Sequence, residues 1–224
     1  MKASAWLMAL ACAGLAGCAT APFPAPEPFA APVAGGLEEI PARFEARLAP
    51  RFAQVNAVVF RFWGRELAAM GMVSVDALER SFAVACLTPI GVKLFEVVCD
   101  RGRIDGRVAL PELEKRGAEL AQAAGVDLAR AYFDRSPPAG APHRMRKGRL
   151  VFSVQDATGT TEYGYAWGDG RLAEKIRRER GRVVWRVDYR EYREGAEGLE
   201  PSGLVIVNRR YGYRLVVSAR EMER

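Results

Sequence analysis

Apolar and polar side chains alternate through much of the C-terminal third of the chain, and this alternation limits the fold more than any other feature. The apolar positions are Leu150, Phe152 and Val154, then Tyr163, Tyr165 and Trp167, then Val183, Trp185, Val187 and Tyr189. A period of two places successive side chains on opposite faces of a strand, so one face is buried and the other meets water. Short turns at 156–159, 168–170 and 180–181 leave no room for helical crossovers. The pattern therefore predicts antiparallel hairpins.

Similar strand signals occur on both sides of this region. They predict strands at 58–62, 66–76, 80–87 and 91–100 upstream, and a last pair at 204–207 and 213–217. The expected total is about nine to eleven antiparallel strands, in two groups with helices inserted between them.

Two stretches break the period of two and predict helices. Apolar residues four apart, at Ile40, Phe44, Leu48 and Phe52, predict a short helix over 40–52 that is interrupted at Pro50. A second apolar stripe predicts helix over 112–133, with Pro111 at its start. Gly125 is expected to end this helix, and Asp127 to cap a short one that follows.

The first 17 residues have the form of a targeting segment. Lys2 precedes an apolar run that is too short to span a bilayer, and the run ends in Leu15-Ala16-Gly17-Cys18. This ending resembles the bacterial lipobox, which implies that the thiol of Cys18 carries the lipid and that residues 1–17 are removed. The alternative is an ordinary secretory peptide with a chance cysteine. By analogy with enteric sorting rules, Ala19 in place of aspartate favours the outer membrane.

Residues 18–36 are rich in alanine and proline and predict a tether. Prolines at 22, 24, 26, 28 and 32 fix the backbone and remove amide donors. Such a segment is a semi-rigid spacer that reaches about 50 Å at about 3.1 Å per residue. The domain itself is expected over 37–224.

Composition excludes most catalytic chemistry. The chain of 224 residues is 50% apolar and 27% charged, as an ordinary folded protein is, and it holds one histidine and four cysteines. His143 lies in a loop-like segment without a nucleophile elbow nearby. We therefore expect no enzyme, no catalytic residue, no metal site and no cofactor.

The formal charge of +6 is concentrated in residues 144–186, where eleven basic side chains face five acidic ones. Arg171, Lys175, Arg177 and Arg178 are the candidate residues of a basic strand face. Such a face suits anionic headgroups or an acidic carrier. The alternative is a solvated outer face whose arginines discourage edge pairing. Nucleic acid is not an expected partner of an exported chain.

Cys86 and Cys99 are expected to be free thiols. If the turn between their strands centres on residues 89 and 90, the two cysteines lie about 20 Å apart along the sheet, at about 3.3 Å per residue. A disulfide needs Cα atoms within about 7 Å of one another.

Taken together, the lipobox, the tether, the N-terminal helix, the long antiparallel strands, the helical insertion and the closing meander resemble the LolA/LolB superfamily of periplasmic lipoprotein carriers and receptors. Segments 87–102 and 200–208 are similar to hairpins of that family, including those of its uncharacterised lipoproteins. The resemblance implies an α+β, mainly β fold: an incomplete antiparallel β-barrel with helices over its open side, around a cavity for acyl chains. The chain lacks a recognisable counterpart of the membrane-inserting loop residue of LolB.

Eight aromatic side chains are the candidate lining of that cavity, although core packing explains each of them as well. They are Phe60, Phe62, Phe152, Tyr163, Tyr165, Trp167, Trp185 and Tyr189.

The resulting hypothesis is a lipid-anchored protein on the periplasmic side of the outer membrane of a Gram-negative bacterium. It holds or transfers an acyl or other apolar chain during envelope biogenesis, as a monomer, with the membrane and a lipid or lipoprotein as its partners. The alternative is a non-catalytic assembly lipoprotein that docks a protein or an anionic envelope polymer through its basic strand face.

Overall fold

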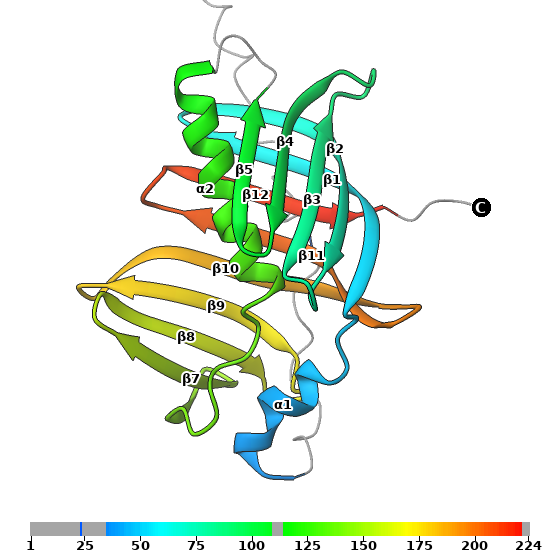
Figure 1. Cartoon of the computed structure of the whole chain (residues 1–224). Coiled ribbons are helices and arrows are strands. Elements are labelled where there is room, and N and C mark those ends of the chain that lie inside the picture. Colours follow the sequence, from blue (N-terminus) through cyan, green and yellow to red (C-terminus); the bar gives the residue numbers. More distant parts are fainter. Residues whose placement is uncertain (1–22, 24–34, 109–113, 221–224) are drawn as a thin grey trace, which may run out of the picture.

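The computed structural model describes residues 23, 35–108 and 114–220. Within them, twelve strands form one antiparallel sheet that curves without closing into a barrel (Figure 1). The strand order is β5-β4-β3-β2-β1-β12-β11-β10-β9-β8-β7-β6. The expected incomplete barrel is confirmed, with one strand more than the upper end of the expected range.

The sheet is two meanders joined at its centre. The strands of the first meander are β1 (Arg51–Phe62), β2 (Arg65–Asp76), β3 (Ser81–Leu87), β4 (Lys93–Asp100) and β5 (Arg103–Val108). Those of the second are β6 (His143–Arg146), β7 (Arg149–Asp156), β8 (Gly159–Ala166), β9 (Leu172–Glu179), β10 (Arg182–Gly195), β11 (Gly198–Asn208) and β12 (Tyr213–Ala219). β1 pairs with β12, so the first and last strands lie side by side.

Several hairpins use two-residue turns that end in glycine. Trp63-Gly64, Arg101-Gly102, Lys147-Gly148 and Arg180-Gly181 each join neighbouring strands, and all eight residues have positive φ. Two successive positive φ angles match the twist of the flanking strands, which explains glycine at the second position.

Three helical segments accompany the sheet: η1 (Leu37–Glu39), α1 (Ile40–Glu45) and α2 (Glu114–Tyr132). α1 is shorter than expected, because the chain turns after Glu45 and Pro50 is followed directly by β1. Phe52 therefore lies on the inner face of β1 and not on a helix; its ring packs edge-on against Tyr132. Neither helix meets the length and hydropathy needed to cross a membrane, among the residues described.

α2 is one continuous helix, so the expected break at Gly125 is wrong. A Cβ at Gly125 would lie 2.6 Å from a methyl group of Ile104 and 2.7 Å from one of Val97. Gly106 of β5 has the same role on the opposite side, because a Cβ there would lie 2.9 Å from the backbone of Ala121. Both glycines allow the helix to approach the sheet closely.

Candidate functional site: two compartments on the inner face

α2 lies against the inner face of the sheet and has two chemically different sides. Leu120, Ala124 and Leu128 face the inner side of β1–β5 and belong to the hydrophobic core. Gln122 and Arg130 face β7–β11 instead. The helix therefore separates an apolar compartment from a polar cleft.

The C-terminal half of α2 and the loop after it are fixed to the sheet by buried hydrogen bonds. The hydroxyl of Tyr189 donates to the carbonyl oxygen of Ala131 at 2.8 Å, and that of Tyr165 donates to the carbonyl of Arg135 at 3.0 Å. Burial raises the pKa of both tyrosines. They therefore remain protonated donors at physiological pH.

Asp127 is the centre of a second set of buried contacts. Its carboxylate, fully shielded from water, accepts hydrogen bonds from the amide of Asn208, the hydroxyl of Tyr213 and the guanidinium of Arg130. Asn208 occupies an inward position in β11, next in alternation to Leu204 and Ile206. A polar residue at an inward strand position was the available sequence signal for this cluster.

The apolar compartment is almost full. About 50 Å³ of free space remains between α2 and the inner faces of β1–β5 and β12. Phe60 and Phe62 line it, together with Val73, Leu120 and Leu215. Binding sites for small molecules have volumes of about 300–1,000 Å³, so this space is too small for a long acyl chain.

A buried polar group borders this apolar space. Asn56 is 2% exposed, and within the described part of the chain its side-chain oxygen has no hydrogen-bond donor. Asn56 of β1 pairs with Gly71 of β2, which has no side chain, and Gly71 pairs in turn with Cys86 of β3. Burial raises the pKa of the Cys86 thiol to about 12, so this thiol is unreactive at neutral pH.

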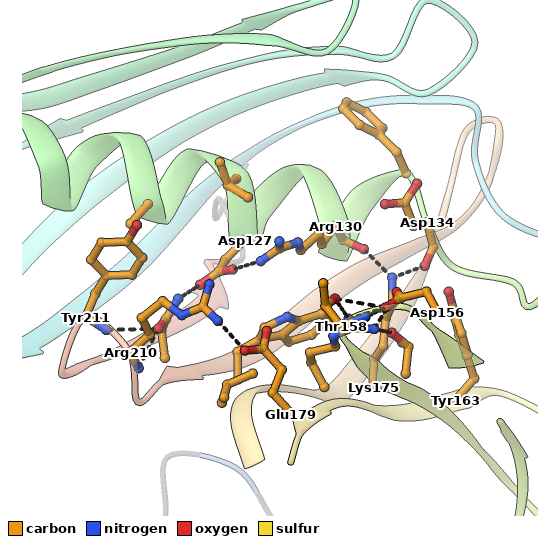
Figure 2. A pocket seen from close by; sticks show the side chains of 18 of the residues that line it. Asp127, Arg130, Asp134, Asp156, Thr158, Tyr163, Lys175, Glu179, Arg210 and Tyr211 are labelled. Carbon is orange, nitrogen blue, oxygen red and sulfur yellow. Dashed lines mark hydrogen bonds and ion pairs between the residues drawn. The ribbon is translucent and has the colours of Figure 1, made fainter. Parts of the chain in front are cut away.

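The polar cleft is a large cavity, with a volume of about 1160 Å³; Figure 2 shows side chains that line it. Asp127, Arg130 and Asp134 of the helix side face Asp156, Lys175 and Glu179 of the strand side across it. Tyr163 and Trp185 contribute aromatic surface. Its size reaches that of small-molecule sites, and most of its lining residues are polar or charged.

Lys175 is the buried cation of this cleft. It is 2% exposed, and its ammonium group donates to the carbonyl oxygens of Arg130, at 3.2 Å, and Asp134. It also lies 4.9 Å from the ring centre of Tyr163 and 5.7 Å from that of Trp185. Burial lowers the pKa of Lys175 to about 8, against a weaker opposing effect of Asp134.

Arg177, two residues after Lys175 in β9, is held by Asp156. Its two terminal nitrogens each lie 2.7 Å from a carboxylate oxygen of Asp156, in a bidentate pair. The side-chain hydrogen bond from Arg177 and the amide and hydroxyl of Thr158 lower the pKa of Asp156.

The eight candidate lining aromatics are divided among different environments. Phe60 and Phe62 border the apolar compartment, whereas Tyr163 and Trp185 border the polar cleft. Phe152, Tyr165 and Tyr189 are packed in the core, and Trp167 is half-buried in the turn between β8 and β9. The eight aromatic side chains therefore do not line one common cavity.

The candidate basic face also does not form as expected. Lys175 and Arg177 point into the inner cleft, because their strand partners Tyr163 and Thr161 are inward residues. Arg178 lies on the outer face and pairs with Glu162, and Arg171 pairs with Asp169 beside the β8–β9 turn. A bulge between Gly164 and Tyr165 shifts the alternation along this edge.

Other expected features have mixed outcomes. Cys86 and Cys99 are free and buried, as expected. His143 is exposed and begins the edge strand β6, so it is not in a loop. Residues 1–17 and the lipidation residue Cys18 lie outside the described residues, as does the tether except for Phe23, Gly35 and Gly36. Within the described residues, no group of histidine, cysteine, aspartate and glutamate side chains is arranged to hold a metal ion.

Comparisons with known proteins find similarity in structure only. No family model matches the sequence, and no curated protein matches it. A LolA superfamily protein from Nitrosomonas europaea superposes with a TM-score of 0.53 at 15% identity, over 85% of this chain and 96% of that one. A putative outer membrane lipoprotein-sorting protein domain from Vibrio parahaemolyticus gives 0.51 at 12% identity, over 82% and 90%.

A DUF1329 family protein from Desulfovibrio piger gives a TM-score of 0.53 at 9% identity, over 82% of this chain and 90% of that one. At these identities the comparisons establish the arrangement of the chain and leave its ligand open. They agree with the open twelve-strand sheet and its helix. The protein therefore has the LolA/LolB-like fold.

Proposed function

We propose that the protein is a non-catalytic binding protein, anchored by a lipid at Cys18 on the periplasmic side of the outer membrane. Its ligand is an acyl or other apolar chain, which it holds or transfers during envelope biogenesis. The observation that carries this proposal is the apolar compartment between α2 and the inner face of β1–β5, which the helix separates from the polar cleft. The names of the structural neighbours support an envelope role of this kind.

Binding requires α2 to move, because the compartment is nearly full. The helix meets β4 and β5 through small residues, chiefly Ala121 and Gly125 against Gly106 and Val97. Small side chains bury little apolar area each, so separating this contact is less costly than separating a contact of large residues. The hydrogen bonds at the C-terminal half remain as a hinge.

The ligand supplies the compensating free energy. Each methylene moved out of water contributes about 0.8 kcal/mol, so a long chain offsets the loss of the contacts between helix and sheet. A ligand hydroxyl or amide could also donate to the unpaired oxygen of Asn56.

Lipid extraction of the purified full chain, followed by mass spectrometry, tests the proposal directly. We expect an apolar-chain molecule in stoichiometric amount, and displacement of it by a fluorescent long-chain fatty acid. A chain that carries no lipid and does not bind the fluorescent probe would contradict the proposal.

A disulfide that fastens α2 tests the entry route. Cysteines at Gly106 and Ala121 place their Cβ atoms about 3.0 Å apart, so a small outward shift of the helix reaches disulfide geometry. We expect the oxidised Gly106→Cys/Ala121→Cys protein to lose binding of the fluorescent fatty acid and the reduced form to regain it. Equal binding in both forms would exclude entry beneath α2.

A further inference from the structure

The outer face of the sheet carries two features that the inner-face function does not use. The first is a docked side chain from the N-terminal segment. Phe23 is 7% exposed and packs against Val205 of β11 and Val216 of β12, with Val59 and Val207 beside them. These valines alternate with inward residues, so the contact is on the face opposite α2.

The sheet provides a recess for this phenyl ring. A Cβ at Gly203 would lie 2.7 Å from a ring carbon of Phe23, so only glycine leaves room for the ring in this position. Gly203 lies across the sheet from Glu191 and Ser218. The tether therefore has a fixed point on the domain at residue 23.

The second feature is a layer of arginines over buried carboxylates. Glu162, Glu174 and Asp188 are only 6–10% exposed at their side chains. Six outer-face guanidinium groups contact these three carboxylates and are themselves 27–62% exposed. They belong to Arg144, Arg146, Arg149, Arg178, Arg186 and Arg190.

Six arginines over three carboxylates leave three positive charges in excess, and the carboxylates lie beneath the guanidinium groups. Guanidinium groups are therefore what this surface presents to solvent. They bind phosphate oxygens readily through their planar set of donors.

Strand register places the two features on the same surface. Asp188 is paired with Val205, and Arg186 with Val207. Directly paired residues of an antiparallel sheet project from the same face. The arginine layer over β6–β10 is thus adjacent to the Phe23 contact on β11 and β12.

We propose that this outer face of β6–β12 is the membrane-docking surface of the protein and that it binds the anionic phospholipid headgroups of the bilayer that holds the anchor. The proposal rests on the lipid anchor at Cys18. Cys18 is five residues before Phe23, a stretch that spans at most about 17 Å when extended. With Phe23 docked, the lipid emerges beside the arginines, and the inner compartments face away from the bilayer.

Orientation in vesicles tests this arrangement. The lipidated full chain is placed in phosphatidylethanolamine vesicles with or without phosphatidylglycerol, with an energy-transfer acceptor on the lipid headgroups. A fluorophore is attached at Ala68→Cys, which is exposed on the outer face beside Val59, or at Gln122→Cys on the cleft side of α2. We expect energy transfer to the headgroups to be several-fold stronger from position 68 than from position 122. Without phosphatidylglycerol this difference becomes smaller.

Paired variants assign the effect to the two features. The double variant Arg144→Gln/Arg178→Gln is expected to reduce the difference in energy transfer between positions 68 and 122. The matched double variant Arg103→Gln/Arg107→Gln on β5 leaves that difference unchanged. Phe23→Ala is expected to weaken transfer from position 68, and Phe23→Leu to retain it.

Two results would overturn the proposal: equal transfer from both positions, or transfer that ignores phosphatidylglycerol and the arginine variants. Mass spectrometry of the N-terminal peptide reports separately on the anchor. If Cys18 carries no lipid, the anchoring part of the proposed function fails, and salt-dependent sedimentation with phosphatidylglycerol vesicles still shows whether the arginine surface binds anionic headgroups.

Discussion

Asp127 shows what one buried carboxylate does for this molecule. It accepts hydrogen bonds from Asn208 of β11, from Tyr213 of β12 and from Arg130 on its own helix. It therefore joins α2 to the two strands at the centre of the sheet, at the boundary between the apolar compartment and the polar cleft.

Removal of this carboxylate is expected to destabilise the fold. Asp127→Ala leaves buried donors without an acceptor, and loss of one partner of a buried charged network reduces the free energy of unfolding by about 3–5 kcal/mol. Chemical denaturation monitored by tryptophan fluorescence measures this. Asp134→Ala is the control, because its carboxylate forms an exposed pair with Arg80, and we expect a change of about 1 kcal/mol or less.

Lys175 predicts a pH dependence of stability with a defined sign. Its folded-state pKa, about 8, is below the ordinary value of 10.5, so between these pH values the unfolded state binds more protons than the folded state. Stability contributed by this residue therefore rises as the pH increases from 8 to 10.5. The stability of the natural protein relative to Lys175→Met should rise by up to about 3 kcal/mol over this window, at 1.36 kcal/mol per pKa unit.

Denaturant titrations of the natural protein and of Lys175→Met at several pH values test this. Tyrosines also titrate near pH 10, but they are present in both proteins, so their effect cancels in the difference between the two free energies of unfolding. A constant difference between the proteins would show that Lys175 titrates normally.

At the scale of elements, the sequence predicts best where one physical signal acts alone. Alternation predicts β7, β8 and β10, and the turns at 168–170 and 180–181 leave a strand between them, where the structure has β9. The first part of β1 was not predicted, because inward-facing Gln54 and Asn56 interrupt the apolar alternation. Gln54 is buried there because its amide donates to Glu200 and to the carbonyl of Pro201, partners nearly 150 residues away.

The helix and the site depend even more on such distant partners. Gly125 normally favours the end of a helix, but here close contact with Val97 and Ile104 keeps α2 continuous. The two-sided division of the inner face could not be read from the sequence either, because Lys175 and Arg177 follow a bulge that the sequence does not mark.

The close packing of α2 on β5 predicts the effect of a single methyl group. Gly106→Ala places a Cβ 2.9 Å from the backbone of Ala121, so the helix has to move away. We expect a loss of about 1–3 kcal/mol in the free energy of unfolding, as for overpacked cores. Thermal denaturation measures this loss. Asp105→Ala at the neighbouring, exposed position is the control and should change the free energy of unfolding little.

For the whole molecule, the proposed lipid anchor gives the simplest prediction. Cys18→Ala removes the thiol that would carry the acyl chains, and membrane association through acyl chains depends on about 0.8 kcal/mol per buried methylene. We expect the protein to be lost from the membrane pellet after cell fractionation. Ala19→Ser, which keeps the thiol, is the control; a Cys18→Ala protein that stays in the pellet would contradict lipidation.

The position of the first and last strands at the centre of the sheet has a consequence for how the protein is made. Phe62 pairs with Tyr213 and Asn56 with Ala219, so the seam between the two meanders joins the ends of the folded domain. Each meander can assemble from neighbouring hairpins, whereas the seam requires closure of a loop that contains nearly the whole domain. The hydrogen-bonded seam between the two halves of the sheet thus cannot form until β12 has left the ribosome. A premature stop before β12 removes the strand pairing between the two meanders as well as one strand.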